Sequence, residues 1–405
     1  MIKKKDLSYE CIIVILFSIL PIIDSLNGIL IENQMTSIGT LYKVFVIGVL
    51  LIMGISDGKI MRKQWGIMIV IIGYISMTIS INSIISNHSI ISVDFPVKLI
   101  FNAVMFVLLV HNITKKHISA DSIYKILNNN TYIIIICVLV PYALNMGNTI
   151  YAGNIGYKAF YYSQNELNAS LIVLFFFSLY KLYNKITISA LFQVCGVLIC
   201  VLLMSTKSSL MACAIGILIF LIDYVRKENS RNKVVIIIAG VIAILISGRF
   251  VISKIADMFT RQSSLFNMYD GSLIATLTSG RTYFLEDAFC EFIESDLFIE
   301  RLLIGNGFCS DYLIEMDFFD IFFYLGIIGV AGVVFFVMYV IMKSRKNMRS
   351  EKCLVRKTGF IVMLAFSFLT GHVLFMATSG CYLVLLCVFN MTYADKSEVN
   401  YEYRS

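Results

Sequence analysis

Long apolar runs separated by short polar segments dominate this chain of 405 residues. A helix needs about 20 mostly apolar residues to cross a bilayer, and runs near this length recur from one end of the sequence to the other. The pattern predicts an all-α, polytopic membrane protein with about twelve transmembrane helices. We expect these helices near residues 11–31, 39–56, 66–86, 97–113, 131–146, 167–184, 187–205, 209–225, 234–250, 318–342, 358–377 and 380–394.

The longest polar segment, residues 250–317, predicts one large extracytoplasmic subdomain. It divides the chain into a membrane domain at 1–249 with the first nine helices, the loop itself, and a part at 318–405 with the last three helices and a tail. Within the loop, the spacing of apolar residues predicts a helix from Thr282 to Leu303. Ser279 or Thr282 is suited to cap this helix, and Gly305-Asn-Gly307 to stop it.

Composition agrees with a membrane protein, since 59% of the residues are hydrophobic, 15% are charged, and the mean hydropathy is +0.83. Soluble domains have roughly 45–50% apolar and about 25% charged residues. This balance excludes a soluble enzyme, a disordered protein and a nucleic-acid-binding domain. The four histidines lack metal-ligand spacing, so we expect no metal and no cofactor, and we interpret His372 as a packing residue with satisfied nitrogens.

The net charge of +7 reflects orientation more than an anionic partner. Lysine and arginine gather in every second loop, which together hold 24 of the 33 basic residues. Because basic loops stay on the cytoplasmic side, both termini are expected to be cytoplasmic.

Three of the remaining basic residues are candidates to bind a phosphate group at the outer ends of the helices: Lys207, Arg249 and Arg281. Lysine is a compact cation, and arginine binds phosphate with two parallel hydrogen bonds. Arg281 also precedes the predicted loop helix, whose free N–H groups favour anions. The structural alternatives are a lysine that only marks the interface, and an arginine paired with Glu286 or Asp287.

Acidic and amide side chains supply the other candidates. Glu315, Asp317 and Asp320 stand at the start of the span 318–342, where 317 and 320 share a helix face at the outer interface. One of the three carboxylates could act as a general base, or all could merely favour the helix N-terminus. Asn165 and Asn168, in a tyrosine-rich outer segment, suit sugar binding but equally an interfacial belt.

The order of these features resembles the Wzy polysaccharide polymerases of the O-antigen polymerase/ligase superfamily. Lys207 stands where the family usually has arginine, and Glu315 stands where the superfamily has histidine, which favours capsule and exopolysaccharide polymerases. The resemblance covers about 155–345 and rests on four stretches: Ser163-Gln-Asn-Glu-Leu-Asn168, Leu203-Met-Ser-Thr-Lys-Ser-Ser-Leu-Met-Ala212, Ser279-Gly-Arg281 with Leu303-Ile-Gly-Asn-Gly-Phe308, and Glu315-Met-Asp-Phe-Phe-Asp-Ile-Phe-Phe-Tyr-Leu-Gly-Ile-Ile-Gly329.

The resemblance implies a metal-independent enzyme of the bacterial cytoplasmic membrane. Such an enzyme joins polyprenyl-diphosphate-linked oligosaccharide repeat units on the outer face, alongside a flippase and a chain-length regulator of the same pathway. By this resemblance the catalytic residues are Glu315, Asp317 and Arg281, and the diphosphate and sugar are bound by Lys207, Arg249, Asn165, Asn168 and Asp320.

Two other functions stay open. A ligase-type glycan transferase would use the same donor with a different acceptor, and the absence of histidine at Glu315 argues against it. A lipid-linked oligosaccharide flippase or another transporter would place its charges near the bilayer midplane, whereas most candidate charges here are expected at the outer rim.

Overall fold

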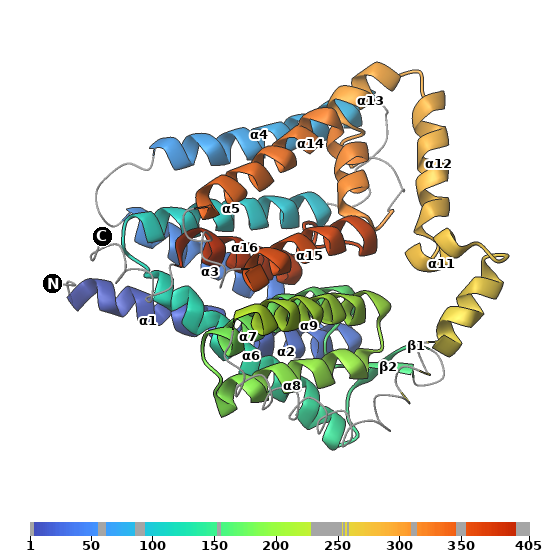
Figure 1. The fold of residues 1–405 in the computed structure, drawn as a ribbon. Helices are drawn as coiled ribbons and strands as arrows, with labels where there is room; N and C mark the ends of the chain where they lie inside the picture. Colours follow the sequence, from blue (N-terminus) through green and yellow to red (C-terminus); the bar gives the residue numbers. More distant parts are fainter. Residues whose placement is uncertain are drawn as a thin grey trace.

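The computed structural model describes residues 4–55, 62–85, 94–151, 155–227, 259–308, 314–345 and 354–393, together with residues 253 and 256. The predicted all-α class is confirmed, because the described chain is almost entirely helical. Most helices run side by side in one bundle (Figure 1). They are α1 (Lys4–Ser18), α2 (Leu20–Glu32), α3 (Gly39–Ile55), α4 (Arg62–Ile85), α5 (Asp94–Thr114), α6 (Ala120–Ala143), α7 (Gln164–Asn184), α8 (Ile188–Met204), α9 (Lys207–Lys227), α11 (Leu273–Thr278), α12 (Arg281–Glu294), α13 (Phe298–Ile304), α14 (Asp317–Ser344), α15 (Leu354–Thr370) and α16 (Ala377–Thr392).

The expected number of membrane spans is wrong, because six helical segments of the described chain, not twelve, are long and apolar enough to cross a membrane. The expected spans at 39–56, 187–205 and 380–394 correspond to α3, α8 and α16, which have only 16 or 17 residues. The expected span at 234–250 lies outside the described residues. The six segments are Tyr9–Glu32, Arg62–Ile84, Asp94–Thr114, Ala120–Ala143, Gln164–Asn184 and Asp317–Ser344.

Helix α7 forms the centre of the bundle. Nearly all of its side chains are buried, including Phe175, Phe176 and Tyr180, and it packs against α6, α8, α9, α15 and α16. Ser163 caps its first turn by accepting a hydrogen bond from the Glu166 N–H. A helix that is apolar on all sides is stable only when other helices surround it, which is the position that α7 occupies.

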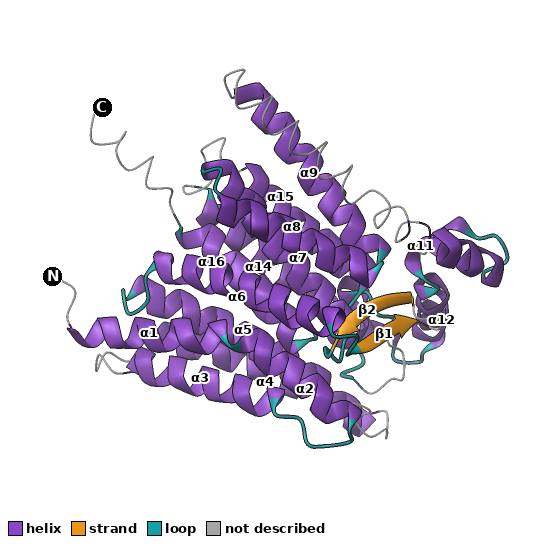
Figure 2. Cartoon of the chain, turned by 90° about the horizontal axis from the view of Figure 1, so that it is seen from below, coloured by secondary structure: helices purple, strands orange, loops and turns teal. Residues whose placement is uncertain are grey.

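A short antiparallel hairpin, β1 (Asn148–Tyr151) and β2 (Ile155–Ala159), joins α6 to α7. The sequence analysis did not predict it. The hairpin lies at the same end of the molecule as α11 and α12, whereas α1 begins at the opposite end (Figures 1 and 2). Which end faces the cytoplasm stays a prediction.

The helix predicted from Thr282 to Leu303 is two helices. α12 ends at Glu294, Ser295 is extended, and α13 begins at Phe298. Neither predicted cap acts: Gly280 precedes α12 without a side-chain bond, and Ser279 ends α11 in the left-handed conformation. Gly305 ends α13, as predicted.

A kink at Gly326 breaks α14 near its start, with φ +62° and ψ −167°. The Asn306 and Gly307 N–H groups donate to the carbonyl oxygens of Phe323 and Tyr324, at 2.8 and 3.1 Å. The kink leaves these two carbonyl oxygens without their usual partners within the helix, and the two N–H groups replace those partners. Backbone groups inside a membrane need such partners because no water is present there. A Cβ on Gly326 would lie 2.4 Å from the Leu303 carbonyl oxygen, so glycine is needed for this close packing of α13 on α14.

Candidate functional site

The start of α7 and the turn between α8 and α9 are joined by hydrogen bonds. The Thr206 hydroxyl donates to Asn168 Oδ1 at 2.9 Å, and Thr206 and Ser209 also share a hydrogen bond. Asn168 is buried, whereas Asn165 is half-buried in the first turn of α7. Two of the stretches that carry the resemblance are therefore in contact, although the expected sugar-binding role of the two asparagines stays a prediction.

Lys207 lies directly after this turn and contacts the segment that contains α11. Its Nζ donates to the Thr276 carbonyl oxygen at 2.6 Å, and the Gln262 side chain donates to the same oxygen at 3.0 Å. Lys207 precedes the predicted span 209–225 and so lies outside the membrane-spanning part. Burial lowers the pKa of Lys207 to about 8, and the positive charges of Arg261 and Arg281 lower it further in the same direction. Three cations therefore gather at this point.

Arg281 is the first residue of α12 and bridges two segments. Its Nη2 lies 2.7 Å from Glu315 Oε2, and its Nη1 donates to the Thr278 carbonyl oxygen at 3.2 Å. Among the described residues its Nε has no hydrogen-bond partner. The pairing with Glu286 or Asp287 that was considered from the sequence is not made, because the guanidinium reaches the start of α14 instead. Arg281 and Lys207 both bond carbonyl oxygens near the end of α11, where helical carbonyls lack partners.

Glu315 has an unusual backbone conformation, with φ +61°, which is uncommon for a residue other than glycine. The Asp320 carboxylate holds the residues on both sides of it, accepting from the Ile314 N–H at 3.0 Å and the Met316 N–H at 2.9 Å. On the other side, a Cβ on Gly371 would lie 2.8 Å from the Glu315 carbonyl oxygen. The Glu315 side chain remains 43% exposed, so its carboxylate is accessible while its backbone is fixed.

Asp317 and Asp320 share a helix face, as expected, but both are 1% exposed rather than at a water interface. Asp317 Oδ2 accepts hydrogen bonds from the Ser367 hydroxyl and from the N–H groups of Val373 and Leu374, the last two at 2.7 and 2.9 Å. These donors come from the end of α15 and from the loop 371–376 that joins α15 to α16. Asp317 thus ties the start of α14 to this loop.

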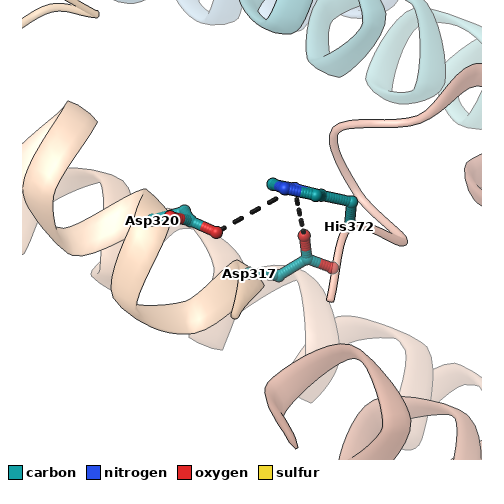
Figure 3. A group of neighbouring side chains, drawn as sticks. All are labelled: Asp317, Asp320 and His372. Atoms are coloured by element: carbon teal, nitrogen blue, oxygen red, sulfur yellow. Dashed lines mark ion pairs between the residues drawn. The ribbon is translucent and has the colours of Figure 1, made fainter. Parts of the chain in front are cut away.

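His372 points between the two aspartates (Figure 3). Its Nδ1 lies 4.0 Å from Asp317 Oδ1 and 3.9 Å from Asp320 Oδ2. The ring packs against Phe95 and Phe375, as a packing residue would. Within the described part of the chain, however, neither ring nitrogen has a hydrogen-bond partner, so the expected satisfied nitrogens are not found. His372 lies in the loop between α15 and α16.

Sequence reasoning did not bring His372 to the two aspartates because more than fifty residues separate them. The available signal was an ionisable residue inside an apolar run, whose default interpretation is functional.

The same signal, an ionisable residue inside an apolar run, also marks Asp24 and Lys43. Lys43 Nζ lies 2.7 Å from Asp24 Oδ1 and donates to the Thr378 hydroxyl, also at 2.7 Å. The Thr378 N–H in turn donates to Glu166 Oε2 at 3.1 Å.

One predicted site residue and one surface depression are not part of the contacts described above. Arg249, a predicted phosphate ligand, lies outside the described residues. An open surface depression of about 560 Å³ on α12 and α13 contains none of the predicted site residues. It is lined by Asp287, Cys290, Glu291, Glu294, Ser295, Asp296 and Arg301.

No protein-family model and no curated protein matches this chain. What the fold and composition define is the class: a helical, multi-pass membrane protein with six candidate membrane spans among its described residues. Its apolar helices associate it with a lipid bilayer.

Proposed function

We propose that this protein polymerises polyprenyl-diphosphate-linked oligosaccharide repeat units into a surface polysaccharide, at the outer face of the bacterial cytoplasmic membrane. The contact of Arg281 with Glu315, next to Lys207, carries the proposal. Each of the three residues comes from a different stretch that resembles the Wzy polymerases. Their association supports a single site with cations for a diphosphate and an accessible carboxylate for a hydroxyl.

The reaction is a glycosyl transfer. A hydroxyl oxygen of the incoming repeat unit forms a bond to the anomeric carbon at the reducing end of the growing chain. The bond from that carbon to the diphosphate oxygen breaks, and the electron pair leaves with the polyprenyl diphosphate. The hydroxyl proton passes to a carboxylate, which later returns it to solvent. The enzyme must therefore stabilise the negative charge of the leaving group and accept one proton.

Lys207 and Arg281 are suited to the first task. Both are now bonded to oxygen atoms of the protein itself, the Thr276 carbonyl and the Glu315 carboxylate. A diphosphate can replace these oxygens, since it offers more negative charge and can accept the parallel bonds that a guanidinium donates. Displacing Glu315 from Arg281 also frees its carboxylate, so donor binding would activate the base.

Glu315 is the best base among the three carboxylates. It is partly exposed, whereas Asp317 and Asp320 are buried and already accept backbone hydrogen bonds. We therefore assign a positioning role to the two aspartates. Asn165 and Asn168, at the start of α7, and Arg249 remain proposed substrate contacts. A flippase and a chain-length regulator are the proposed partners in the same pathway.

One observation favours a transporter as the second candidate. The pair Asp24–Lys43 is buried between helices α2 and α3, and buried charges in membrane helices often mark an ion or substrate pathway. The direct contact of Lys43 with Thr378 and of Thr378 with Glu166 links this pair to the starts of α16 and α7.

Deleting the gene in its host, and then sizing the lipid-linked and surface glycans, separates these functions. Polymerase activity predicts single lipid-linked repeat units on the outer face and loss of the long-chain ladder. Full-length lipid-linked polymer would identify a ligase instead. Repeat units trapped on the inner face would identify a flippase, and unchanged glycans would refute all three.

A further inference from the structure

Three potential metal ligands face one another between α14 and the loop 371–376. One atom from each of Asp317, Asp320 and His372 lies within 4.8 Å of the others. Figure 3 shows the imidazole directed toward both carboxylates. The separations of 3.9 and 4.0 Å from Nδ1 are too long for hydrogen bonds. The three groups therefore surround a common point without bonding each other.

The polar atoms at this point are buried and unsatisfied. His372 is 3% and Asp317 1% exposed, and in the described ranges Asp317 Oδ1 and both His372 nitrogens lack hydrogen-bond partners. Burying such atoms without a partner is energetically unfavourable. A bound cation would supply the missing interaction for the carboxylate oxygen and for one nitrogen at once.

The surrounding bonds hold the ligands in place. The other oxygen of Asp317 accepts from Ser367, Val373 and Leu374, and Asp320 accepts from two backbone N–H groups. The ring of His372 stacks on Phe95, with centroids 5.4 Å apart, and packs edge-on against Phe375. In protein metal sites, such contacts to the ligating side chains fix the orientation in which these side chains bind the metal.

We propose that Asp317, Asp320 and His372 bind one divalent transition-metal ion, Zn²⁺ or Mn²⁺. Imidazole suits zinc, and carboxylates suit both zinc and manganese. Tetrahedral ligands at ordinary bond lengths lie about 3.3–3.6 Å apart, so the three atoms, which lie within 4.8 Å of one another, need to move inward to bind an ion. Three protein ligands leave one position for a fourth ligand.

The ion would fasten the start of α14 to the loop between α15 and α16. Glu315 lies next to both, since its carbonyl faces Gly371 and its neighbours bond Asp320. The metal therefore positions the backbone of Glu315 rather than contacting its exposed carboxylate. This inference rests on the ligand geometry and does not depend on the proposed polymerase activity.

Metal content is the direct test. The full-length chain is purified in detergent, depleted with a chelator, and titrated with Zn²⁺ and, separately, Mn²⁺, with bound metal measured by mass spectrometry. We expect one equivalent of one of these ions, and an unfolding midpoint that rises with the logarithm of its concentration. The His372→Ala and Asp320→Asn variants should lose this equivalent. The control variant His111→Ala should retain it. His111 lies in the last turn of α5, whereas Phe95, which stacks on His372, lies at the start of that helix.

A cobalt experiment covers the case in which His372→Ala does not fold. Co²⁺ substituted into the wild-type site should show the visible bands of a low-coordinate ion, and His372→Cys should add a thiolate-to-cobalt charge-transfer band. Absence of stoichiometric bound metal in the wild-type protein would overturn the proposal. Equal binding by His372→Ala and wild type, or an unchanged cobalt spectrum in His372→Cys, would also overturn it.

Discussion

The guanidinium of Arg281 and the carboxylate of Glu315 lie 2.7 Å apart, although 34 residues separate them in the chain. The contact joins the first turn of α12 to the residue that precedes Met316 and α14, and it brings the guanidinium of Arg281 to the acidic start of a long apolar helix. Glu315 is partly exposed, and Asp320 holds the backbone on both sides of it.

Replacing Arg281 with alanine should abolish polymer while the amount of protein in the membrane stays normal. A lost cation in the leaving-group site costs about 10²- to 10³-fold in rate, which is enough to remove long chains. The measurement is the glycan ladder with the protein quantified in the same membranes. Arg301→Ala, in α13, is the matched control and should keep the ladder. Wild-type chain lengths in Arg281→Ala would remove Arg281 from the site.

Glu315→Gln should be far more damaging than Glu286→Gln. The amide keeps the shape of Glu315 but accepts no proton, and loss of a general base costs about 10²- to 10⁴-fold. Glu286 lies on α12 in the same segment and serves as the control for a lost negative charge. The comparison is the rate of chain extension from a purified lipid-linked repeat unit. Equal, mild effects would leave Glu315 as a structural residue.

Diphosphate binding should weaken as the pH rises through about 8, the lowered pKa of Lys207. Below that value the amine carries its proton and attracts the anion, whereas above it the amine is neutral. An ordinary lysine would stay charged to about pH 10. Binding of a polyprenyl diphosphate, followed between pH 7 and 9, tests this. Lys207→Arg stays charged and should flatten the profile, and a flat wild-type profile would contradict the prediction.

Gly326→Ala should destabilise the protein by about 1–3 kcal/mol, because the residue has φ +62° and its new Cβ would meet the Leu303 carbonyl. Gly332→Ala is the control: it lies in the same helix, and a Cβ there meets nothing within 4 Å. Denaturant unfolding in detergent measures both. Similar stability of the two variants would show that the contact of α13 with the kink contributes little.

Lys43→Met should be strongly destabilising, by about 3–5 kcal/mol, since it leaves Asp24 buried and unpaired. The double variant Asp24→Asn with Lys43→Met removes both charges and should recover much of the loss. Unfolding measurements on the single and double variants give the coupling. If the double variant is as stable as wild type and still makes polymer, the pair is structural, which would weaken the transporter alternative.

Some features of this protein followed from residue types alone. Runs of apolar residues determined that the chain is helical and crosses a membrane, because no other backbone structure of such composition satisfies its hydrogen bonds in lipid. Gly305 as the end of α13 and the shared helix face of Asp317 and Asp320 were equally local, since a glycine stop and a helical period depend only on neighbouring residues.

The contacts between distant segments were decided only by tertiary structure. The number of spans was overestimated in part because α3, α8 and α16 are apolar but have only 16 or 17 residues. The partner of Arg281 was not Glu286 or Asp287 but Glu315, and His372, although its ring packs on Phe95 and Phe375, also faces two aspartates. A sequence shows which residues are costly to bury, but which groups offset that cost depends on which helices lie side by side, and that is set by packing over the whole bundle.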